Sequence, residues 1–299
     1  MELAPILLFV YNRLSHVGRT LEALAINDLA SESDLFIYAD NSKSIEDQEK
    51  VDEVRSYVRT VRGFRSVTIV ERDENYGLAR SIIAGVTEVV DRFGKVIVLE
   101  DDLITAPHFL RYMNDALDFH RDEERVASVS GYSFPLGRAL PETFLLKYTA
   151  CWGWGTWRRG WELFDPSGEK LLAEIRKRGA GREFDMDGAY PYLQMLEKQC
   201  RGEVDSWAVR WHASLFLADR LMLFPGRSLV SNIGHDGSGV HCSDAVHFDV
   251  ALSDSPVQVG KIHVVADGGI AALLENYFRN LNPGLFRYLV RKIIKRLKI

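Results

Sequence analysis

The chain has 299 residues, of which 46% are hydrophobic and 26% are charged. This composition is typical of a soluble globular protein, and the length allows one large α/β domain or two smaller ones. The 42 acidic residues outnumber the 37 basic ones, giving a net charge of −5. That balance argues against a general nucleic-acid-binding protein, because neutralising phosphates requires a basic face.

The charge is distributed unevenly along the chain. Six basic residues and no acidic residue lie in 287–299, so the first 286 residues hold 31 basic and 42 acidic residues, a net charge of −11. At about 100° per residue, the apolar positions of 286–299 share one side of a helix and the basic positions share the other. This pattern predicts an amphipathic helix that lies on an anionic membrane surface, or packs on the acidic body or a second subunit.

Cysteine usage and hydropathy bear on the cellular location. Three scattered cysteines, Cys151, Cys200 and Cys242, form neither a disulfide framework nor a CxxC metal motif. They favour a reducing compartment, and we expect a cytoplasmic protein. No apolar run is long enough to span a membrane, and the N-terminus lacks the basic region of a signal peptide.

The first 131 residues alternate between strand and helix patterns. The predicted strands are 5–10, 35–39, 67–70, 96–99 and 126–130, and the predicted helices are 16–27, 45–61, 77–93 and 107–120. This alternation indicates βαβ units and a mostly parallel sheet. Ligands of such sheets bind beyond the carboxyl ends of the strands, so the polar clusters that follow four of these strands are expected to meet at one rim. These clusters are 11–13, 40–41, 73–75 and 100–102.

Beyond residue 131 the pattern changes. All six tryptophans lie between Trp152 and Trp211, the stretch 221–224 is strand-like, and no clear linker separates the two halves. We therefore expect the second half to pack on the same sheet as the first.

Three consecutive carboxylates, Glu100, Asp101 and Asp102, follow the apolar strand 96–99. Such a cluster is costly without a cation, and hard oxygen ligands suit Mg2+ or Mn2+, which bind through one or two carboxylates plus substrate phosphates. The alternative is a solvated acidic turn that caps the next helix. The apolar strand before the cluster favours the metal site.

The segment from Asn75 to Arg80 joins a predicted strand to a predicted helix. Gly77 permits close approach of the backbone to a ligand, and Arg80 has the reach to contact a phosphate. A plain helix N-terminus capped by Asn75 explains the same residues equally well.

The run CWGWGTW at 151–157 is rich in tryptophan and glycine. Indole faces stack on the C–H faces of sugar rings, so the run is a candidate sugar-binding segment; core packing is the alternative. Further along, Asp205 is either the N-cap of a predicted helix or a general base. His235 and His241, in a polar loop, are candidate metal ligands or phosphate contacts.

Taken in order, these segments resemble the GT-A nucleotide-sugar glycosyltransferases, most of all the bacterial family-2-like enzymes related to the N-acetylglucosaminyltransferase I group. The matching segments are PILLFVYNR at 5–13, YADN at 38–41, NYGLAR at 75–80, VLEDDL at 98–103, WGWGTW at 152–157, DSWAVRW at 205–211 and SLVSNIGHDGSGVH at 228–241. The resemblance implies a GT-A (Rossmann-like) α/β fold, with a mostly parallel sheet flanked by helices. Its implied parts are a nucleotide-sugar-binding half at 1–131, an acceptor-binding half at 132–270 and a helical, basic amphipathic tail at 271–299.

The resemblance also implies roles for single residues. Asp102 and His241 would bind the divalent metal, Mn2+ or Mg2+, and Asp205 would be the catalytic base of an inverting transfer. The nucleotide sugar would be contacted by Tyr11, Arg13, Asp40, Asn75, Arg80, Glu100 and Asp101. The acceptor would be bound by Trp152, Gly153, Trp154 and Trp207.

The implied activity is transfer of a hexosyl or N-acetylhexosaminyl group from a nucleoside-diphosphate sugar, with UDP-sugars favoured, to a glycan or lipid-linked glycan acceptor. This activity belongs to bacterial surface polysaccharide synthesis, and a peripheral position at the inner face of the plasma membrane would bring the enzyme to its acceptor. One alternative is a sugar nucleotidyltransferase, disfavoured because residues 11–15 lack the glycine cluster such an enzyme needs near its first strand. The other is a non-catalytic sugar-binding protein of the same fold.

Overall fold

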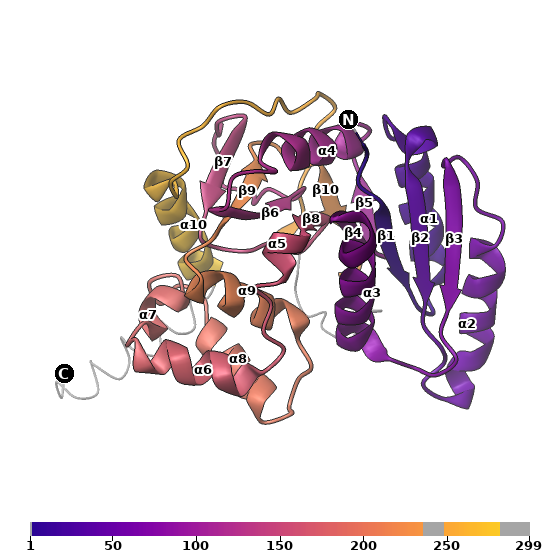
Figure 1. The fold of residues 1–299 in the computed structure, drawn as a ribbon, viewed down its shortest axis with the longest axis horizontal. Helices are drawn as coiled ribbons and strands as arrows, with labels where there is room; N and C mark the ends of the chain where they lie inside the picture. Colours follow the sequence, from indigo (N-terminus) through magenta and orange to yellow (C-terminus); the bar gives the residue numbers. More distant parts are fainter. Residues whose placement is uncertain (1, 236–247, 282–299) are drawn as a thin grey trace, which may run out of the picture.

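The computed structural model describes residues 2–235 and 248–281. In this part of the chain, an eight-stranded sheet has the order β3-β2-β1-β4-β8-β6-β9-β7 (Figure 1). Its strands are β1 Ile6–Val10, β2 Asp34–Ala39, β3 Ser66–Glu71, β4 Lys95–Glu100, β6 Val126–Ser130, β7 Thr143–Leu146, β8 Trp154–Trp157 and β9 Leu221–Pro225. Only β7 and β8 run against the others, so the predicted mostly parallel sheet is confirmed.

Helices cover both faces of this sheet. They are α1 Leu14–Ala25, α2 Ile45–Val58, α3 Gly77–Phe93, α4 Phe109–Phe119, α5 Arg158–Trp161, α6 Gly168–Lys177, α7 Gly181–Phe184, α8 Tyr192–Cys200, α9 Trp207–Leu217 and α10 Gly268–Leu281, with a 3-10 helix at Ala30–Glu32. The chain therefore has an α/β fold of the GT-A type.

Strand β1 shows how the two faces are built. Its residues Ile6, Leu8 and Val10 enter a core with α1, α2 and α4, whereas Leu7 and Phe9 enter a second core with α3, α9 and α10. Successive strand side chains point to opposite faces, so an entirely apolar run such as this one is stable only when both faces are covered.

Helix α3 has the bounds that its apolar spacing predicts. It ends at Phe93 because Gly94 adopts φ +76°, the left-handed conformation that commonly terminates helices. The other strands and helices predicted in the first 131 residues are also present, with ends that differ by up to three residues.

Among the described residues, four strands were not predicted: β5, β7, β8 and β10. Two of them form a separate ribbon. β5, Leu103–Thr105, pairs antiparallel with β10, Val230–Asn232, in a separate two-stranded ribbon. This ribbon begins directly after the acidic cluster and joins the two halves of the chain, which are far apart in sequence.

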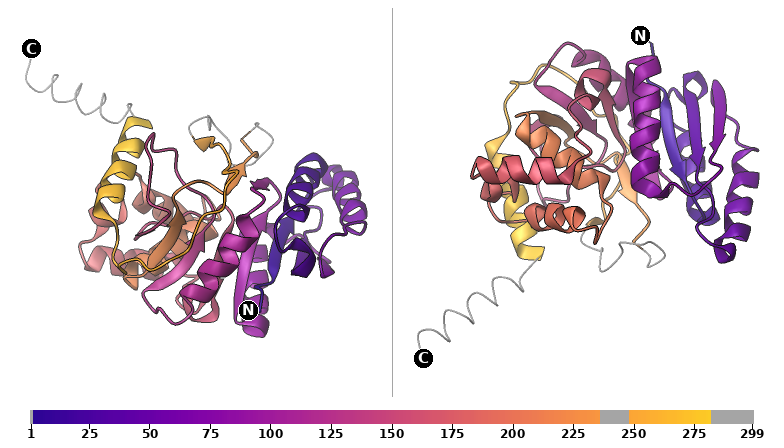
Figure 2. Two further views of the ribbon diagram at one scale, coloured as in Figure 1. Left: turned by 90° about the horizontal axis from the view of Figure 1, so that it is seen from above. Right: turned by 60° about the horizontal axis from the view of Figure 1, so that its bottom comes forward.

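The second half supplies the rest of the large sheet and a helical layer. Helices α6 to α9 share a small core of their own, built around Leu172, Ile175 and Phe184. Helix α10 lies at the opposite end of the molecule from α2 (Figures 1 and 2). The predicted basic tail, 271–299, begins inside α10, and its remaining residues, 282–299, lie outside the described part of the chain.

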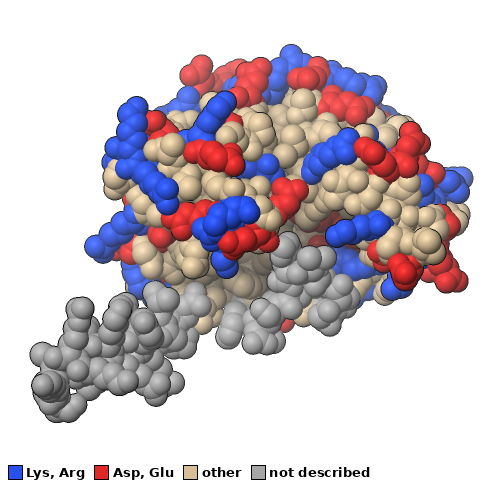
Figure 3. Space-filling view, turned by 90° about the horizontal axis from the view of Figure 1, so that it is seen from below, with Lys and Arg blue, Asp and Glu red and all other residues tan. Residues whose placement is uncertain are grey.

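Figure 3 shows the molecule from below the view of Figure 1. Among the described residues on this face, acidic and basic side chains are interspersed and neither sign forms an extended area. Within residues 2–235 and 248–281, no helix combines the length and hydropathy needed to cross a membrane.

Candidate functional site

A cavity of about 830 Å3 lies at the carboxyl ends of β1, β2 and β4, where the sequence predicts a ligand-binding rim. It has two walls of different chemistry. The polar wall is made by Tyr11, Asn12, Arg13, Asp40, Lys43, Asp47, Asn75, Ser81, Glu100, Asp101 and Asp102. The aromatic wall is made by Tyr132, Phe134, Trp152, Tyr190, Tyr192, Phe248 and Phe278, with smaller residues between them. The four predicted polar clusters thus converge.

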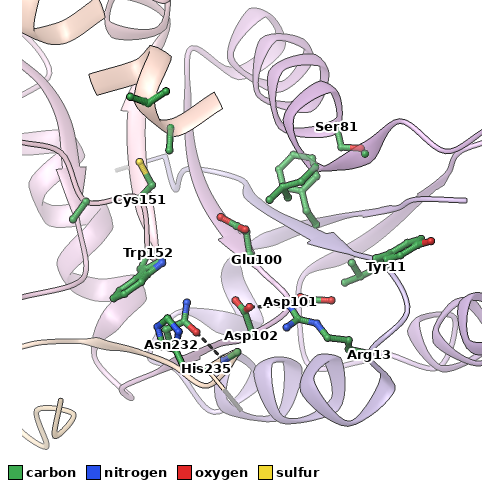
Figure 4. Close-up of a pocket in the computed structure, with 18 of the residues that line it drawn as sticks. Tyr11, Arg13, Ser81, Glu100, Asp101, Asp102, Cys151, Trp152, Asn232 and His235 are labelled. Atoms are coloured by element: carbon green, nitrogen blue, oxygen red, sulfur yellow. Dashed lines mark hydrogen bonds and ion pairs between the residues drawn. The ribbon is translucent and has the colours of Figure 1, made fainter. Parts of the chain in front are cut away.

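The acidic cluster at the end of β4 is held by an arginine that is 88 positions away in sequence. Arg13 donates a hydrogen bond to the Asp101 carboxylate, and a second one of 2.8 Å to Oδ2 of Asp102. The hydroxyl of Thr20 donates to the backbone oxygen of Asp101 at 2.8 Å. These contacts fix two of the three carboxylates, while Glu100 points into the space between the walls (Figure 4).

One arginine does not balance three carboxylates. Burial raises the pKa of Asp101, although the neighbouring Arg13 lowers it. Burial, together with the neighbouring carboxylates of Asp102 and Asp101, raises the pKa of Glu100. Raised pKa values mean that the charged carboxylates are unfavourable as they stand. A further cation bound here would therefore stabilise the charged form of the cluster.

Asp40 organises the loop that begins α3. Its Oδ1 accepts hydrogen bonds from the backbone N–H groups of Asn41, at 2.9 Å, and Tyr76, at 2.8 Å. Its Oδ2 accepts from the Gly77 N–H at 2.9 Å and the Asn75 side chain at 3.2 Å. An anion at a helix N-terminus satisfies N–H groups that have no partner within the helix. Asp40, which follows β2, thus caps the N-terminus of α3.

Tyr11 and Asn12 connect β1 to the start of α2. Both side chains donate hydrogen bonds of 3.1 Å to the Asp47 carboxylate, and the Tyr11 hydroxyl accepts one of 3.0 Å from the backbone N–H of Lys43. Lys43 itself lies on the cavity lining. This corner brings an aromatic ring, an amide and a cation to the polar wall.

The segment after β10 passes directly over the acidic cluster. The backbone N–H of Ile233 donates to the backbone oxygen of Asp102 at 2.8 Å, and a Cβ added at Gly234 would lie only 2.2 Å from Oδ2 of Asp102. His235 and Asn232 lie beside Asp102 in Figure 4. Among the described residues, neither ring nitrogen of His235 has a hydrogen-bond partner, although both are buried.

These residues fit a divalent cation. The carboxylate of Asp102 and the imidazole of His235 are donors that Mn2+ accepts, and the excess negative charge of the cluster favours any such ion. No group of three or more His, Cys, Asp or Glu side chains within the described ranges forms a metal site by protein ligands alone. Mg2+ and Mn2+ sites that bind substrate phosphates commonly use only one or two carboxylates.

The aromatic wall is held by ring contacts. The Tyr132 ring packs edge-on against Trp152, with centroids 4.7 Å apart, and its hydroxyl donates to the backbone oxygen of Phe248 at 3.0 Å. Phe278 from α10 lies 4.9 Å from Tyr190. Cys151 faces this side of the cavity, and burial raises the pKa of its thiol, so that the thiol is neutral.

The run at 151–157 is mostly structural. Trp154 is 0% exposed and Trp207 is 3% exposed, and their rings stack at 5.3 Å in a cluster with Trp161 and Trp211. Because neither indole reaches a cavity wall, the predicted acceptor contacts of Trp154 and Trp207 are corrected to core packing. Of the predicted acceptor-binding tryptophans, only Trp152 lines the cavity.

Gly153 also has a structural role. It adopts φ +61°, its oxygen accepts from the N–H of Gly131, and an added Cβ would lie 2.6 Å from Val230. It is buried and does not line the cavity, so the prediction that it contacts the acceptor is corrected to a backbone and packing requirement.

Two other predicted residues lie away from the cavity. Arg80 is exposed, pairs with Glu74 at 2.9 Å and stacks 3.6 Å above the ring of Tyr76. Asp205 is 68% exposed and pairs with Arg210 at 2.9 Å. Neither is part of the cavity lining.

Asp205 is also not the N-cap of the helix that follows it, which was its alternative predicted role. The N-cap of α9 is Ser206, whose hydroxyl accepts from the N–H of Val209. The first turn of α9, however, contributes Ala208 and Val209 to the lining. The predicted metal ligand His241 lies outside the described residues.

Sequence reasoning missed several residues of the lining. Asn12 lies inside the predicted cluster 11–13 but was given no role of its own. Lys43 and Asp47 follow the predicted cluster 40–41, and their place between β2 and the first turn of α2 was a usable signal. The aromatic residues Phe248 and Phe278 come from the last part of the described chain. Nothing local in the sequence marks them, since their position depends on how α10 packs.

Comparison with known proteins bears on the first half of the chain. Residues 6–141 match the sequence model of glycosyl transferase family 2. No curated protein sequence is significantly similar to the chain.

Several solved structures are similar to parts of this chain. S. aureus TarS is 17% identical over 47% of this chain and 23% of that chain, with a TM-score of 0.33. A structure of S. aureus TarS 1–349 is 14% identical over 76% of this chain and 59% of that one, with a TM-score of 0.43. The mannosyltransferase PcManGT from Pyrobaculum calidifontis, in complex with GDP-Man and Mn2+, is 14% identical over 72% of this chain and 69% of that one, with a TM-score of 0.40.

This chain spans less than two thirds of the length of both TarS structures. The family match covers the strands and helices that build the polar wall, from β1 to β6. The match and the strand order together support a GT-A fold, similar to glycosyl transferase family 2 over residues 6–141.

Proposed function

We propose that this chain is a metal-dependent, inverting glycosyltransferase that moves a sugar from a nucleoside-diphosphate sugar to a hydroxyl of a glycan or lipid-linked glycan. UDP-sugars and hexosyl or N-acetylhexosaminyl groups are the favoured donors, and surface polysaccharide synthesis is the proposed pathway. The proposal depends on the acidic cluster at the end of β4, which Arg13 holds and which lines the cavity. The cluster and Arg13 both lie within the residues that match glycosyl transferase family 2.

The polar wall is the proposed donor site. Tyr11, with Lys43 beside it, suits a nucleoside and its phosphates, since the wall offers an aromatic ring and a cation next to hydrogen-bonding groups. Asp40 and Asn75 hold the adjoining loop in place. Asp102 and His235 are the residues proposed to hold Mn2+ or Mg2+, which would supply charge neutralisation for the departing diphosphate.

Asp205 is the proposed base that takes the proton of the acceptor hydroxyl. Support comes from its segment: Ala208 and Val209, in the same stretch of chain, line the cavity beside the aromatic wall. A carboxylate at this position can act on an acceptor that enters along the start of α9. To do so, Asp205 gives up its ion pair with Arg210 and accepts a hydrogen bond from the acceptor hydroxyl. Holding both reactants in one cavity supplies the remaining rate enhancement by orientation.

Donor binding is tested by calorimetry with a panel of nucleoside-diphosphate sugars in the presence and absence of Mn2+. We expect one donor class to bind only with Mn2+, and Asp102→Asn to weaken that binding by about 100-fold. Asp73→Asn is the matched control, because Asp73 is an exposed acid near the same rim. If no member of the panel binds the unmodified chain, the proposed function is wrong.

The role of Asp205 is tested separately with the donor so identified. Asp205→Asn is expected to leave donor affinity unchanged and to slow transfer by about 100-fold or more, the usual effect of removing a general base. Glu203→Gln, an exposed acid two positions earlier, is expected to leave transfer unchanged. Equal turnover in the two variants would remove Asp205 from the mechanism.

The basic segment 286–299 is proposed to hold the enzyme at the cytoplasmic face of an anionic membrane, near a lipid-linked acceptor. Its support is the sequence pattern alone, because these residues lie outside the described chain. Deleting 286–299 should abolish binding to phosphatidylserine vesicles and spare transfer to a soluble acceptor. Unfolding of the truncated chain would instead favour a segment packed on the protein.

A further inference from the structure

We propose that the aromatic wall binds an uncharged, apolar portion of the acceptor, so that the acceptor is an amphiphile and its reacting hydroxyl adjoins that portion. This inference rests on the proposed function and names the substrate class of the same site. It follows from the difference between the two walls, beginning with their charges.

Every lining residue that carries a full charge belongs to the first half of the chain. These residues are Arg13, Lys43, Asp40, Asp47 and the acidic cluster. Beyond Asp102, the described residues of the lining include no Lys, Arg, Asp or Glu. A phosphorylated or acidic acceptor placed there would lose its hydration without meeting an opposite charge, which is strongly unfavourable.

The polar atoms of the aromatic wall are few, and some are already engaged. The hydroxyl of Tyr132 donates to a backbone oxygen, and the Cys151 thiol is a weak donor that burial keeps neutral. A wall of this kind offers little to the several hydroxyls of a sugar ring. It offers much to an alkyl, isoprenoid or aryl group, which needs only contact area.

The wall is also preformed. Tyr190 contacts Tyr192 at 4.6 Å and Phe278 at 4.9 Å, so rings from two separate segments hold one another in place. Trp152 is braced in the same way by Phe248 at 5.7 Å. A rigid apolar surface loses little freedom when a ligand binds, and each methylene buried on it raises affinity by about fourfold.

Met195 on α8 offers a direct way to change this wall. It is half-buried and lines the cavity, whereas its neighbour Gln194 is exposed. Met195→Gln keeps the length of the side chain and adds no charge. Met195→Glu has nearly the same shape and adds a carboxylate inside the cavity, and Gln194→Glu adds the same carboxylate one position away, in solvent.

The experiment uses the full chain and two neutral probes, octyl β-D-glucoside below its critical micelle concentration and methyl β-D-glucoside, followed by calorimetry. We expect the octyl glycoside to bind at least about 100-fold more tightly than the methyl glycoside, since its chain adds seven methylenes. Equal binding of the two probes would mean that the wall recognises a sugar ring, and would overturn the inference.

The variants locate the binding. Met195→Glu should weaken octyl glycoside binding at least about tenfold relative to Met195→Gln, because only the carboxylate differs between them. Gln194→Glu should bind as the unmodified chain does. Thermal unfolding of all three variants confirms that each is folded, and equal affinities in Met195→Glu and Met195→Gln would place the alkyl group elsewhere.

The donor panel described above separates this inference from the proposed function. Amphiphile binding without any nucleotide binding would leave the aromatic wall as assigned and remove the glycosyltransferase activity. Nucleotide binding without amphiphile binding would keep the activity and remove the amphiphilic acceptor.

Discussion

The two walls of the cavity are stabilised by different forces. On the polar wall, hydrogen bonds hold several of the functional groups: Arg13 holds Asp101 and Asp102, and Asp40 holds the start of α3. On the aromatic wall, ring packing holds the groups, and few hydrogen bonds are involved. Hydrogen bonds depend on the identity of single atoms, whereas packing depends on volume and shape.

This difference predicts opposite sensitivities. Substitutions that keep shape and change charge should damage the polar wall, and substitutions that keep charge and change volume should damage the aromatic wall. A buried polar group within the aromatic region should be tolerated only while it remains neutral.

The largest effect is expected from Arg13→Met, which keeps the length of the side chain and removes the cation. Three carboxylates then share the end of β4 without a counter-charge, and we expect the free energy of unfolding to fall by about 4 kcal/mol. Denaturant unfolding measures this loss. Added Mn2+ should restore more stability to the variant than to the unmodified chain, because the ion replaces the missing charge.

Arg80→Met provides the control for that substitution. Arg80 pairs with Glu74 on the exposed surface, and its loss should change stability by at most about 0.5 kcal/mol. Equal losses in the two variants would mean that the polar wall does not depend on Arg13.

The next effect concerns His212, which stacks on Phe184 and contacts the tilted ring of the cavity residue Tyr192. Burial lowers its pKa from 6.5 to about 4. Between these values the unfolded chain binds a proton that the folded chain does not, so stability falls as the pH drops from about 6.5 to 4. The expected loss is about 3 kcal/mol, measured by unfolding at a series of pH values.

His212→Phe removes the titrating group and keeps an aromatic ring beside Phe184. Its stability should therefore fall less steeply over the same pH range. An unchanged slope would show that other groups cause the acid sensitivity.

The smallest of the three effects is expected from Asp40→Asn. The new amide replaces one acceptor oxygen by an N–H donor that faces the backbone N–H of Tyr76 or Gly77. Leaving one such group unsatisfied should cost about 2 kcal/mol and weaken donor binding. Asp73→Asn, on the exposed rim, should leave both quantities unchanged, and a similar loss there would argue against the capping role.

The fold of the first 131 residues could be predicted because its signals are local. Apolar runs mark strands that are buried on both faces, and the spacing in α3 together with Gly94 sets that helix. Strand β8 was not predicted, because its run Trp-Gly-Thr-Trp contains a glycine, which usually weakens strands. Here Gly155 is needed, since an added Cβ would meet Met113 at 2.9 Å and a backbone oxygen of Val96 at 3.0 Å.

The site was predictable to the extent that topology places it. Residues at strand ends, such as Asp40 and Glu100, were predicted from the alternation of strands and helices. The pairing of Arg13 with the acidic cluster was not, because it depends on side-chain reach across the rim. The roles of Trp154 and Trp207 were misjudged for a similar reason, since sequence shows aromatic content and not which rings face each other.

The ribbon of β5 and β10 bears on how this protein tolerates mutation. It aligns the segment of Asp102 with the segment of His235 by main-chain hydrogen bonds, so that alignment does not depend on which side chains the two strands carry. Polar substitutions at the partly exposed ribbon positions Ile104 and Ser231 should therefore change the spacing of the two groups little. Leu103 and Val230 are fully buried, so they tolerate few substitutions because of packing. Gly234 is constrained for a different reason, because any side chain at this position would enter the space of the Asp102 carboxylate.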